Sequence, residues 1–201
     1  MSRPSLRAEQ VAQTRTALVA AGRALFGRRG FAETSVEDLA TEARVTTGAL
    51  YHHFPTKTAL FEVVFEELHA ELLALAARVA AGAGDETERL VSGFAAFLDA
   101  MLRADVQRIL VSDAPAVLGL ERFVELDERY AVSAISEALR SASAAGRLHA
   151  EDPDTLARLL LGALTRGAML IASAEEPTSA RDAVVAAVRS LLGNLSGGSR
   201  S

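Results

Sequence analysis

Three observations predict an all-α fold. Apolar residues recur at helical spacing through almost the whole chain, no convincing run of alternating β-branched residues interrupts them, and all five prolines fall where a helix cannot continue or is about to begin. Hydrophobic residues make up 50% of the 201 residues, so the chain can bury a substantial core. We expect about nine helices, divided between an N-terminal three-helix domain and a C-terminal helical bundle.

Residues 1–56 are expected to form the three-helix domain, because start and stop signals follow one another closely there. Ser and Thr stand where a first turn needs a side-chain acceptor, a glycine can end the first helix, and a proline must end the third. These signals are the start near Ala8, the stop at Gly30, the cap Ser35 with Asp38 three residues on, the cap Thr46 and the stop at Pro55.

Residues 57–196 are expected to form the larger domain, and residues 197–201 a disordered tail. The fourth helix joins the two domains directly, so it can transmit movement as a rigid-body tilt. The expected helices run from the cap Thr56 to Gly82, from Asp85 through Met101, from Ala104 to Gly119 with a break at Pro115, from Glu121 to Ala145, from Asp152-Pro153 to about Ala172, and from Ser179 through Leu195.

Charge is distributed unevenly along the chain. The net charge is −5, but residues 1–60 hold eight Lys and Arg against five Asp and Glu, a net +3, and the remainder carries −8. A mildly basic head on an acidic body suits a polyanion-binding module joined to another domain.

The long apolar stretch 156–174 is expected to be a core or interface helix, because Arg158 and Arg166 would be costly inside a membrane. The first apolar stretch carries Arg15 and Arg23 and does not resemble a signal-peptide core. We therefore expect a cytoplasmic protein without a membrane partner. The chain has no cysteine from which to build a disulfide or metal scaffold.

The second and third helices, separated by a turn near Arg44-Val45, have the spacing of a helix-turn-helix. Most of the third helix is polar, and Leu50 and Phe54 are its only clearly apolar residues. Small residues near its start, Gly48 and Ala49, permit close approach to phosphates or base edges. The sequence therefore favours DNA binding through the third helix.

The same region resembles the DNA-binding domain of the tetracycline-repressor (TetR) family over roughly residues 11–65. The resemblance implies a homodimer whose last two helices form a four-helix bundle, a ligand pocket in the C-terminal domain, and release of operator DNA when ligand binds. It is carried by Ala20-Ala21, Leu25-Phe26 and Gly30-Phe31, by the run from Thr34 to Ala40, by the run from Val45 to Lys57, and by Leu60-Phe61.

The resemblance also implies which residues contact DNA. The reading-helix positions are Thr46, Thr47, Gly48, Ala49, Tyr51, His52 and His53. Tyr51 and Lys57 match phosphate contacts, although Tyr51 could instead pack, and Thr34 and Ser35 stand where the second helix meets a phosphate. Arg44 replaces a frequent turn glycine. A left-handed conformation would cost a non-glycine residue about 1 kcal/mol, so the turn is expected to differ slightly from that of the family. Arg44 is instead a candidate contact to the DNA backbone.

Metal binding and catalysis are not expected, and neither is a cofactor. His52 and His53 are adjacent and would point in different directions on a helix. Glu66 and His69 form one half of a di-iron motif that has no second copy, so a solvated face is favoured. No nucleophile and base, and no glycine-rich phosphate loop, supports an enzyme. A helical-bundle metal oxidase is therefore the weaker alternative.

Two charged residues stand out in the C-terminal half, because Asp113 and Arg166 are each embedded in apolar sequence. Three interpretations stay open: they pair with each other, reach the surface, or contact ligand, with structural pairing or exposure favoured. A grouping of large side chains is also a candidate for an apolar ligand cavity, although each is more often plain core. Its members are Phe94, Phe97, Met101, Phe123, Tyr130 and Met169.

The sequence thus predicts a ligand-responsive DNA-binding transcriptional regulator, a repressor released from a palindromic operator by a small molecule. Repression follows from the resemblance alone. The principal alternative is a DNA-binding structural or nucleoid-type protein without an effector.

Overall fold

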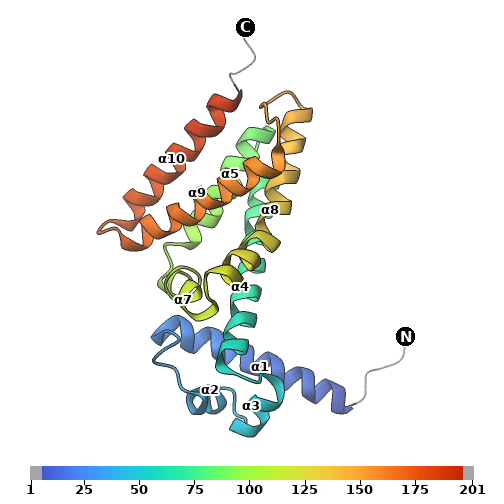
Figure 1. Cartoon of the computed structure of the whole chain (residues 1–201), viewed down its shortest axis with the longest axis vertical. Helices are drawn as coiled ribbons and strands as arrows, with labels where there is room; N and C mark the ends of the chain where they lie inside the picture. The colour runs from blue at the N-terminus through green and yellow to red at the C-terminus, as the bar shows by residue number, and fades with distance from the viewer. Residues whose placement is uncertain (1–5, 197–201) are drawn as a thin grey trace.

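The computed structural model describes residues 6–196 and is helical throughout its regular elements (Figure 1). This confirms the predicted all-α class; the tail expected at 197–201 lies outside the described residues. The elements are α1 (Leu6–Arg29), α2 (Val36–Glu42), α3 (Thr47–His53), α4 (Lys57–Ala81), α5 (Glu86–Ala100), α6 (Ala104–Gln107), the π-helical segment η1 (Arg108–Asp113), α7 (Ala114–Leu118), α8 (Leu120–Ala144), α9 (Pro153–Ser173) and α10 (Pro177–Ser196).

The N-terminal domain consists of α1, α2 and α3 and occupies the lower part of Figure 1. The side chain of Ser35 accepts the Asp38 N–H at 3.0 Å while the Asp38 carboxylate accepts the Ser35 N–H at 3.1 Å, so the predicted capping box is present. The apolar faces of the N-terminal domain pack around an aromatic cluster of Phe26, Phe31 and Phe61, whose ring centroids lie 5.3 to 5.7 Å apart. The third of these rings belongs to α4, which ties that helix to this domain.

Helix α4 contacts both α1 and the bundle helices α5 and α8. It begins at the Thr56 cap, packs first against α1, and continues upward into the bundle formed with α5 and α8 (Figure 1). Its buried stripe is continuous along the helix, with Leu60 and Phe61 toward α1 and Leu68 and Leu72 further on. A displacement of α4 in the bundle would therefore also move the N-terminal domain.

The C-terminal bundle contains α5, α8, α9 and α10. Among the described residues, α9 is the one helix long and apolar enough to span a membrane by length and composition. In the structure it packs against α8, α5 and α10, as a core helix does. A Cβ at Gly167 would lie 2.7 Å from Val184 Cγ1, so glycine allows α9 and α10 to approach this closely.

Two element boundaries differ from the prediction. Residues 104–118 stay helical instead of breaking at Pro115, because η1 changes the hydrogen-bond pattern just before it and Pro115 then falls in the first turn of α7, where its missing N–H needs no partner. The last helix begins at Pro177, two residues before the expected start at Ser179. Proline suits the first helical position, and Glu176 O accepts the Ala180 N–H.

Candidate DNA interface and ligand cavity

Helix α3 lies at the lower end of the molecule (Figure 1), and most of its polar residues are exposed. Leu50 is its buried anchor, and Tyr51 is 53% exposed despite its size. The other predicted reading positions on this segment are exposed or half-buried: Thr46, Thr47, Gly48, Ala49, His52 and His53. Because the large aromatic ring of Tyr51 is exposed to solvent, it is available for contact with a binding partner.

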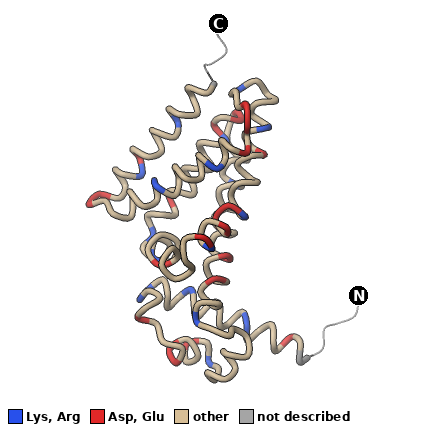
Figure 2. The backbone as a smooth tube through the Cα atoms, in the orientation of Figure 1, with Lys and Arg blue, Asp and Glu red and all other residues tan. Residues whose placement is uncertain are grey.

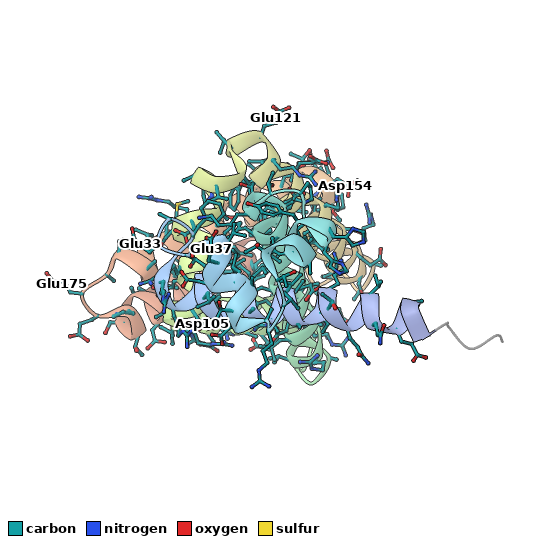
Figure 3. All side chains as sticks on the ribbon, turned by 90° about the horizontal axis from the view of Figure 1, so that it is seen from below. Glu33, Glu37, Asp105, Glu121, Asp154 and Glu175 are labelled. Atoms are coloured by element: carbon teal, nitrogen blue, oxygen red, sulfur yellow. The ribbon has the colours of Figure 1, made fainter. Side chains whose placement is uncertain are left out.

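Figure 3 views the molecule from the end that α1, α2 and α3 form. Glu33 and Glu37 lie on the α2 side of this end, whereas α3 itself contains no carboxylate. Lys and Arg are interleaved with Asp and Glu along both domains in Figure 2, and in the N-terminal domain Arg29 lies 3.5 Å from Asp38. Helix α3 therefore presents hydroxyl, imidazole and phenol groups and does not form a continuous basic surface.

The turn between α2 and α3 depends on Arg44. Its φ is +57°, which is the left-handed region, and Val45 N–H donates to Ala40 O at 2.9 Å. The expectation that arginine would make the turn differ is therefore wrong. The residue adopts the positive φ that glycine adopts readily, in a turn between two helices whose residues Leu39 and Leu50 are both buried in the core.

Replacing Arg44 by glycine is expected to stabilise the fold by up to about 1 kcal/mol, because glycine adopts positive φ without strain. Urea unfolding of the wild type, Arg44→Gly and Arg44→Ala measures this. The alanine variant removes the same charge but keeps the strain, so it should stay close to the wild type. A gain shared by both variants would mean that charge, and not backbone strain, is the cause.

Two predicted phosphate contacts have intramolecular partners. Thr34 is fully buried and its hydroxyl donates to Gly30 O at 2.7 Å, so it cannot reach a phosphate as predicted. The Lys57 ammonium donates to Phe31 O and Thr34 O, both at 2.8 Å, and lies 4.1 Å from the Phe31 ring centroid. Lys57 thus holds the loop between α1 and α2, and only its third N–H is left for DNA. Ser35, in contrast, is exposed.

A cavity of about 690 Å³ lies between α4, α5, α8 and α9. Its volume falls in the range typical of sites for small organic ligands. The lining is mostly alanine, leucine and aromatic; the polar lining residues are His69, Arg89, Glu137 and Ser141. This arrangement can hold an apolar molecule, with few groups to orient it.

His69 contradicts the expectation of a solvated face. The residue is only 3% exposed, and its ring is surrounded by Phe65, Phe97 and Tyr130, whose ring centroids lie 5.4, 6.4 and 5.8 Å away. Burial lowers the pKa of His69 to about 4, so the ring is neutral at neutral pH. Glu66 is half-buried and Glu67 is exposed, which is why the sequence around His69 looks solvated.

The partner of His69 is Asp127 on α8. His69 Nε2 lies 3.5 Å from Asp127 Oδ1, and the Thr165 hydroxyl oxygen lies 3.2 Å from Asp127 Oδ2 and 3.0 Å from Leu161 O. Burial raises the pKa of Asp127 to about 6. Sequence reasoning missed this pair; the signal was the position of His69 four residues after Phe65, next to the buried stripe of α4.

Of the eight residues predicted for the ligand site, two line the cavity and six do not. Phe94 and Phe97 line the cavity, and Met101, Phe123 and Phe97 line a void of about 20 Å³ on the other side of His69. Tyr130 is stacked on His69. Met169 and Arg166 also lie outside the cavity lining, and Arg166 is exposed on α9. The predicted cavity contact is therefore wrong for Met101, Phe123, Tyr130, Met169 and Arg166.

Asp113 lies at the boundary of the two domains and does not line the cavity. Its Oδ2 accepts the Phe31 N–H at 2.8 Å, and Arg108, also on η1, donates to Arg28 O at 2.5 Å. Both bonds hold the chain where α1 ends and turns at Gly30, whose φ is +88°. Asp113 and Arg166 therefore do not pair with each other, and neither lines the cavity: Asp113 binds a backbone N–H, and Arg166 reaches the surface.

Asp113→Ala is expected to destabilise the protein by about 1.5–3 kcal/mol, because it removes a charge-assisted bond and leaves the Phe31 N–H without an acceptor. Asp113→Asn keeps an acceptor oxygen and should cost clearly less. Urea unfolding of the three proteins tests this. Equal stability of the alanine variant and the wild type would show that the contact does not hold the domains together.

The outer faces of α9 and α10 carry few charges. Leu159 is 67% exposed on α9, and Leu191 is 54% exposed on α10. The arginines of α10 are turned toward α5: Arg181 lies 2.6 Å from Asp99, and Arg189 lies 2.5 Å from Glu88. Small residues occupy much of the remaining surface of these two helices.

These features define a helix-turn-helix DNA-binding protein with a separate ligand-cavity domain. Residues 18–64 match the family model described as "Bacterial regulatory proteins, tetR family". Residues 87–195 match the model described as "Tetracyclin repressor-like, C-terminal domain". The chain therefore belongs to the TetR family of transcriptional regulators, in which homodimers are typical. It is a DNA-binding regulator, as the sequence predicts.

Individual relatives agree with this assignment. A TetR-family transcriptional regulator from Pectobacterium atrosepticum is 34% identical and superposes with a TM-score of 0.84, covering 98% of this chain and 100% of that chain. The transposon Tn10 TetC protein of Escherichia coli is 24% identical over 77% of this chain and 78% of that protein. The KstR2 repressor of Mycobacterium tuberculosis is 28% identical over 61% of this chain and 62% of that protein.

Proposed function

We propose that this regulator is a repressor that binds a palindromic operator as a homodimer and releases it when a small molecule enters the cavity. The observation that carries this proposal is the position of α4. The helix lines the cavity with His69, Leu73, Ala76, Ala77, Ala80 and Ala81, and its first turn packs in the DNA-binding domain. Ligand in the cavity can therefore bias the position of the reading helix.

The bound state would pair two copies through α9 and α10 and place two α3 helices in successive major grooves, roughly 34 Å apart. A ligand that fits one position of α4 better than another shifts the population between operator-competent and released states. Repression is supported by the relative KstR2, which is a transcriptional repressor. A small-molecule effector is supported by the fold neighbour RolR, whose structure contains the ligand resorcinol. RolR is 19% identical with a TM-score of 0.74.

Within DNA recognition, we propose that Thr46, Thr47, Gly48, Ala49, Tyr51, His52 and His53 read bases and backbone. Ser35 and Arg44 would add exposed phosphate contacts, with the third N–H of Lys57 as a further one. Tyr51 is the strongest candidate because its ring has no core to pack into. The regulator would act in the cytoplasm and without catalysis.

The test is fluorescence anisotropy with DNA that flanks the protein's own gene, in a salt series. Tyr51→Ala should weaken binding by about tenfold, because one phosphate contact and its packing are lost. Leu120→Ala is the matched control: Leu120 is 72% exposed on α8, away from α3, and should bind like the wild type. If Tyr51→Ala binds like the control, α3 is not the reading element.

A nucleoid-type protein without effector is the second candidate. It would bind unrelated DNA as tightly as the flanking DNA, so competition with a scrambled duplex of the same length separates the two. A specific repressor should keep at least a roughly thousandfold preference.

A further inference from the structure

The cavity is elongated, because three helices line it over several turns each. Its lining residues run from His69 to Ala81 on α4, from Arg89 to Phe97 on α5 and from Ala131 to Ser141 on α8. With a rise of about 1.5 Å per residue, these stretches span about 18, about 12 and about 15 Å. The three helices pack against one another, so the stretches lie side by side. A molecule that fills this space is therefore long in one direction.

The ends of the three stretches coincide. At one end, the His69 ring is stacked on Tyr130 of α8 and lies 6.4 Å from the Phe97 ring of α5, measured between centroids. At the other end, Arg147, shortly beyond α8, lies 4.0 Å from Glu86, the first residue of α5. Helix α4 ends just before α5 begins. The cavity thus has a His69 end and an end at the α4–α5 junction.

The two ends differ in exposure. The lining residues at the His69 end include Ala131 and Leu164, which are 2% and 4% exposed. All the exposed lining residues lie further toward the α4–α5 junction. They are Ala77, Ala81, Arg89, Ala134, Glu137 and Ser141. The cavity is therefore closed at the His69 end and opens toward the junction.

The charged lining residues are also confined to one end. Arg89 and Glu137 lie at the open end, and each has a partner there, because Arg89 is 3.8 Å from Glu86 and Glu137 is 3.5 Å from Arg140. At the closed end the lining is apolar apart from His69, whose ring is packed between aromatic rings. A charged or hydroxyl group of a ligand keeps its water at the open end and loses it at the closed end.

We propose that the effector is an elongated amphiphile, with an apolar chain and a polar group at one end only. The chain lies along α4 with its tip toward His69 and Phe97, and the polar group stays in water between Arg89 and Glu137. This inference rests on the proposed function of the cavity as the effector site. A compact molecule leaves much of the cavity unfilled, and a molecule that is polar at both ends must bury one polar group.

The experiment is isothermal titration calorimetry of the full chain with hexanol, octanol and decanol, each with one terminal hydroxyl. The affinity should rise about fourfold with each added CH₂, because each one is buried in the apolar part of the cavity. Decanediol, with a hydroxyl at each end, should bind about tenfold more weakly than decanol or worse, since its second hydroxyl has to enter the closed end.

A pair of alanine variants on α4 tests the position of the chain. Ala76 lines the cavity midway between its ends, so Ala76→Phe places a ring in the path of the chain and should remove the gain from hexanol to decanol. Ala74→Phe is the matched control, because Ala74 is exposed on the same helix and does not line the cavity. It should bind the alcohols like the wild type. The alcohol series and the diol need only the wild type, so they test the inference even if Ala76→Phe does not fold.

The outcomes separate the inference from the proposed function. Equal wild-type affinities for the three alcohols, or equal affinities for decanol and decanediol, overturn the elongated amphiphile and leave the cavity standing as a ligand site. A gain with chain length that persists in folded Ala76→Phe overturns it in the same way. If none of the alcohols binds the wild type, the assignment of the cavity as the effector site is overturned together with the inference.

Discussion

Replacing Leu159 and Leu191 together by glutamate is expected to produce a monomer and to weaken operator binding by about 100-fold or more. Both side chains are more than half exposed, on α9 and α10, where the charges of α10 are directed toward α5. Burying two carboxylates from each copy against apolar surface is unfavourable. A monomer holds one reading helix, so it loses the second half-site.

Analytical ultracentrifugation and fluorescence anisotropy measure the two effects. Leu120→Glu is the matched control, because Leu120 is 72% exposed but lies on α8, and this variant should stay dimeric and bind DNA normally. If the double variant stays dimeric, the interface lies elsewhere. If it is monomeric but binds with wild-type affinity, pairing of reading helices is not what gives the affinity.

The second large effect concerns stability at acidic pH. Burial lowers the pKa of His69 from 6.5 to about 4 and raises that of Asp127 from 3.8 to about 6. Between pH 6 and pH 4 the unfolded chain holds a proton on His69, whereas the folded protein holds one on Asp127. Both states bind the same number of protons from this pair, so its contribution to stability changes little in that window.

Asp127→Asn removes the carboxyl that takes up a proton in the folded protein. Acidification from pH 6.5 to pH 4 then protonates His69 only in the unfolded chain, so the variant should lose on the order of 3 kcal/mol more than the wild type. Urea unfolding across that range measures the difference. The double variant His69→Phe/Asp127→Asn, which titrates at neither position, should again be as insensitive as the wild type. If the unfolding free energies of Asp127→Asn and the wild type changed in parallel with pH, the pKa shifts given for His69 and Asp127 would be contradicted.

The fold was predictable where the signals are local. Ser35, Thr46, Thr56 and Asp152 each cap the helix that the sequence assigns to them, because a cap is decided within four residues. The π-helical segment before Pro115 was not predictable, since a proline signal indicates a break or a start and does not specify how the preceding turn adapts.

The site was predictable only in part, because contacts over long sequence separation decide it. Lys57 looked like a phosphate ligand until the fold brought the carbonyls of Phe31 and Thr34 to its ammonium. Asp113 looked like a cavity or ion-pair residue until η1 placed it against the end of α1. For the same reason, motif spacing could not predict the pairing of His69 on α4 with Asp127 on α8.

The central claim is that two α3 helices of one dimer read two halves of an operator. A hydroxyl-radical footprint on DNA that flanks the protein's own gene tests it directly. We expect two protected patches on one face of the duplex, roughly 34 Å apart from centre to centre or a multiple of that, with both patches lost in Tyr51→Ala at the same protein concentration. A single patch, or uniform protection of any DNA supplied, would contradict the claim.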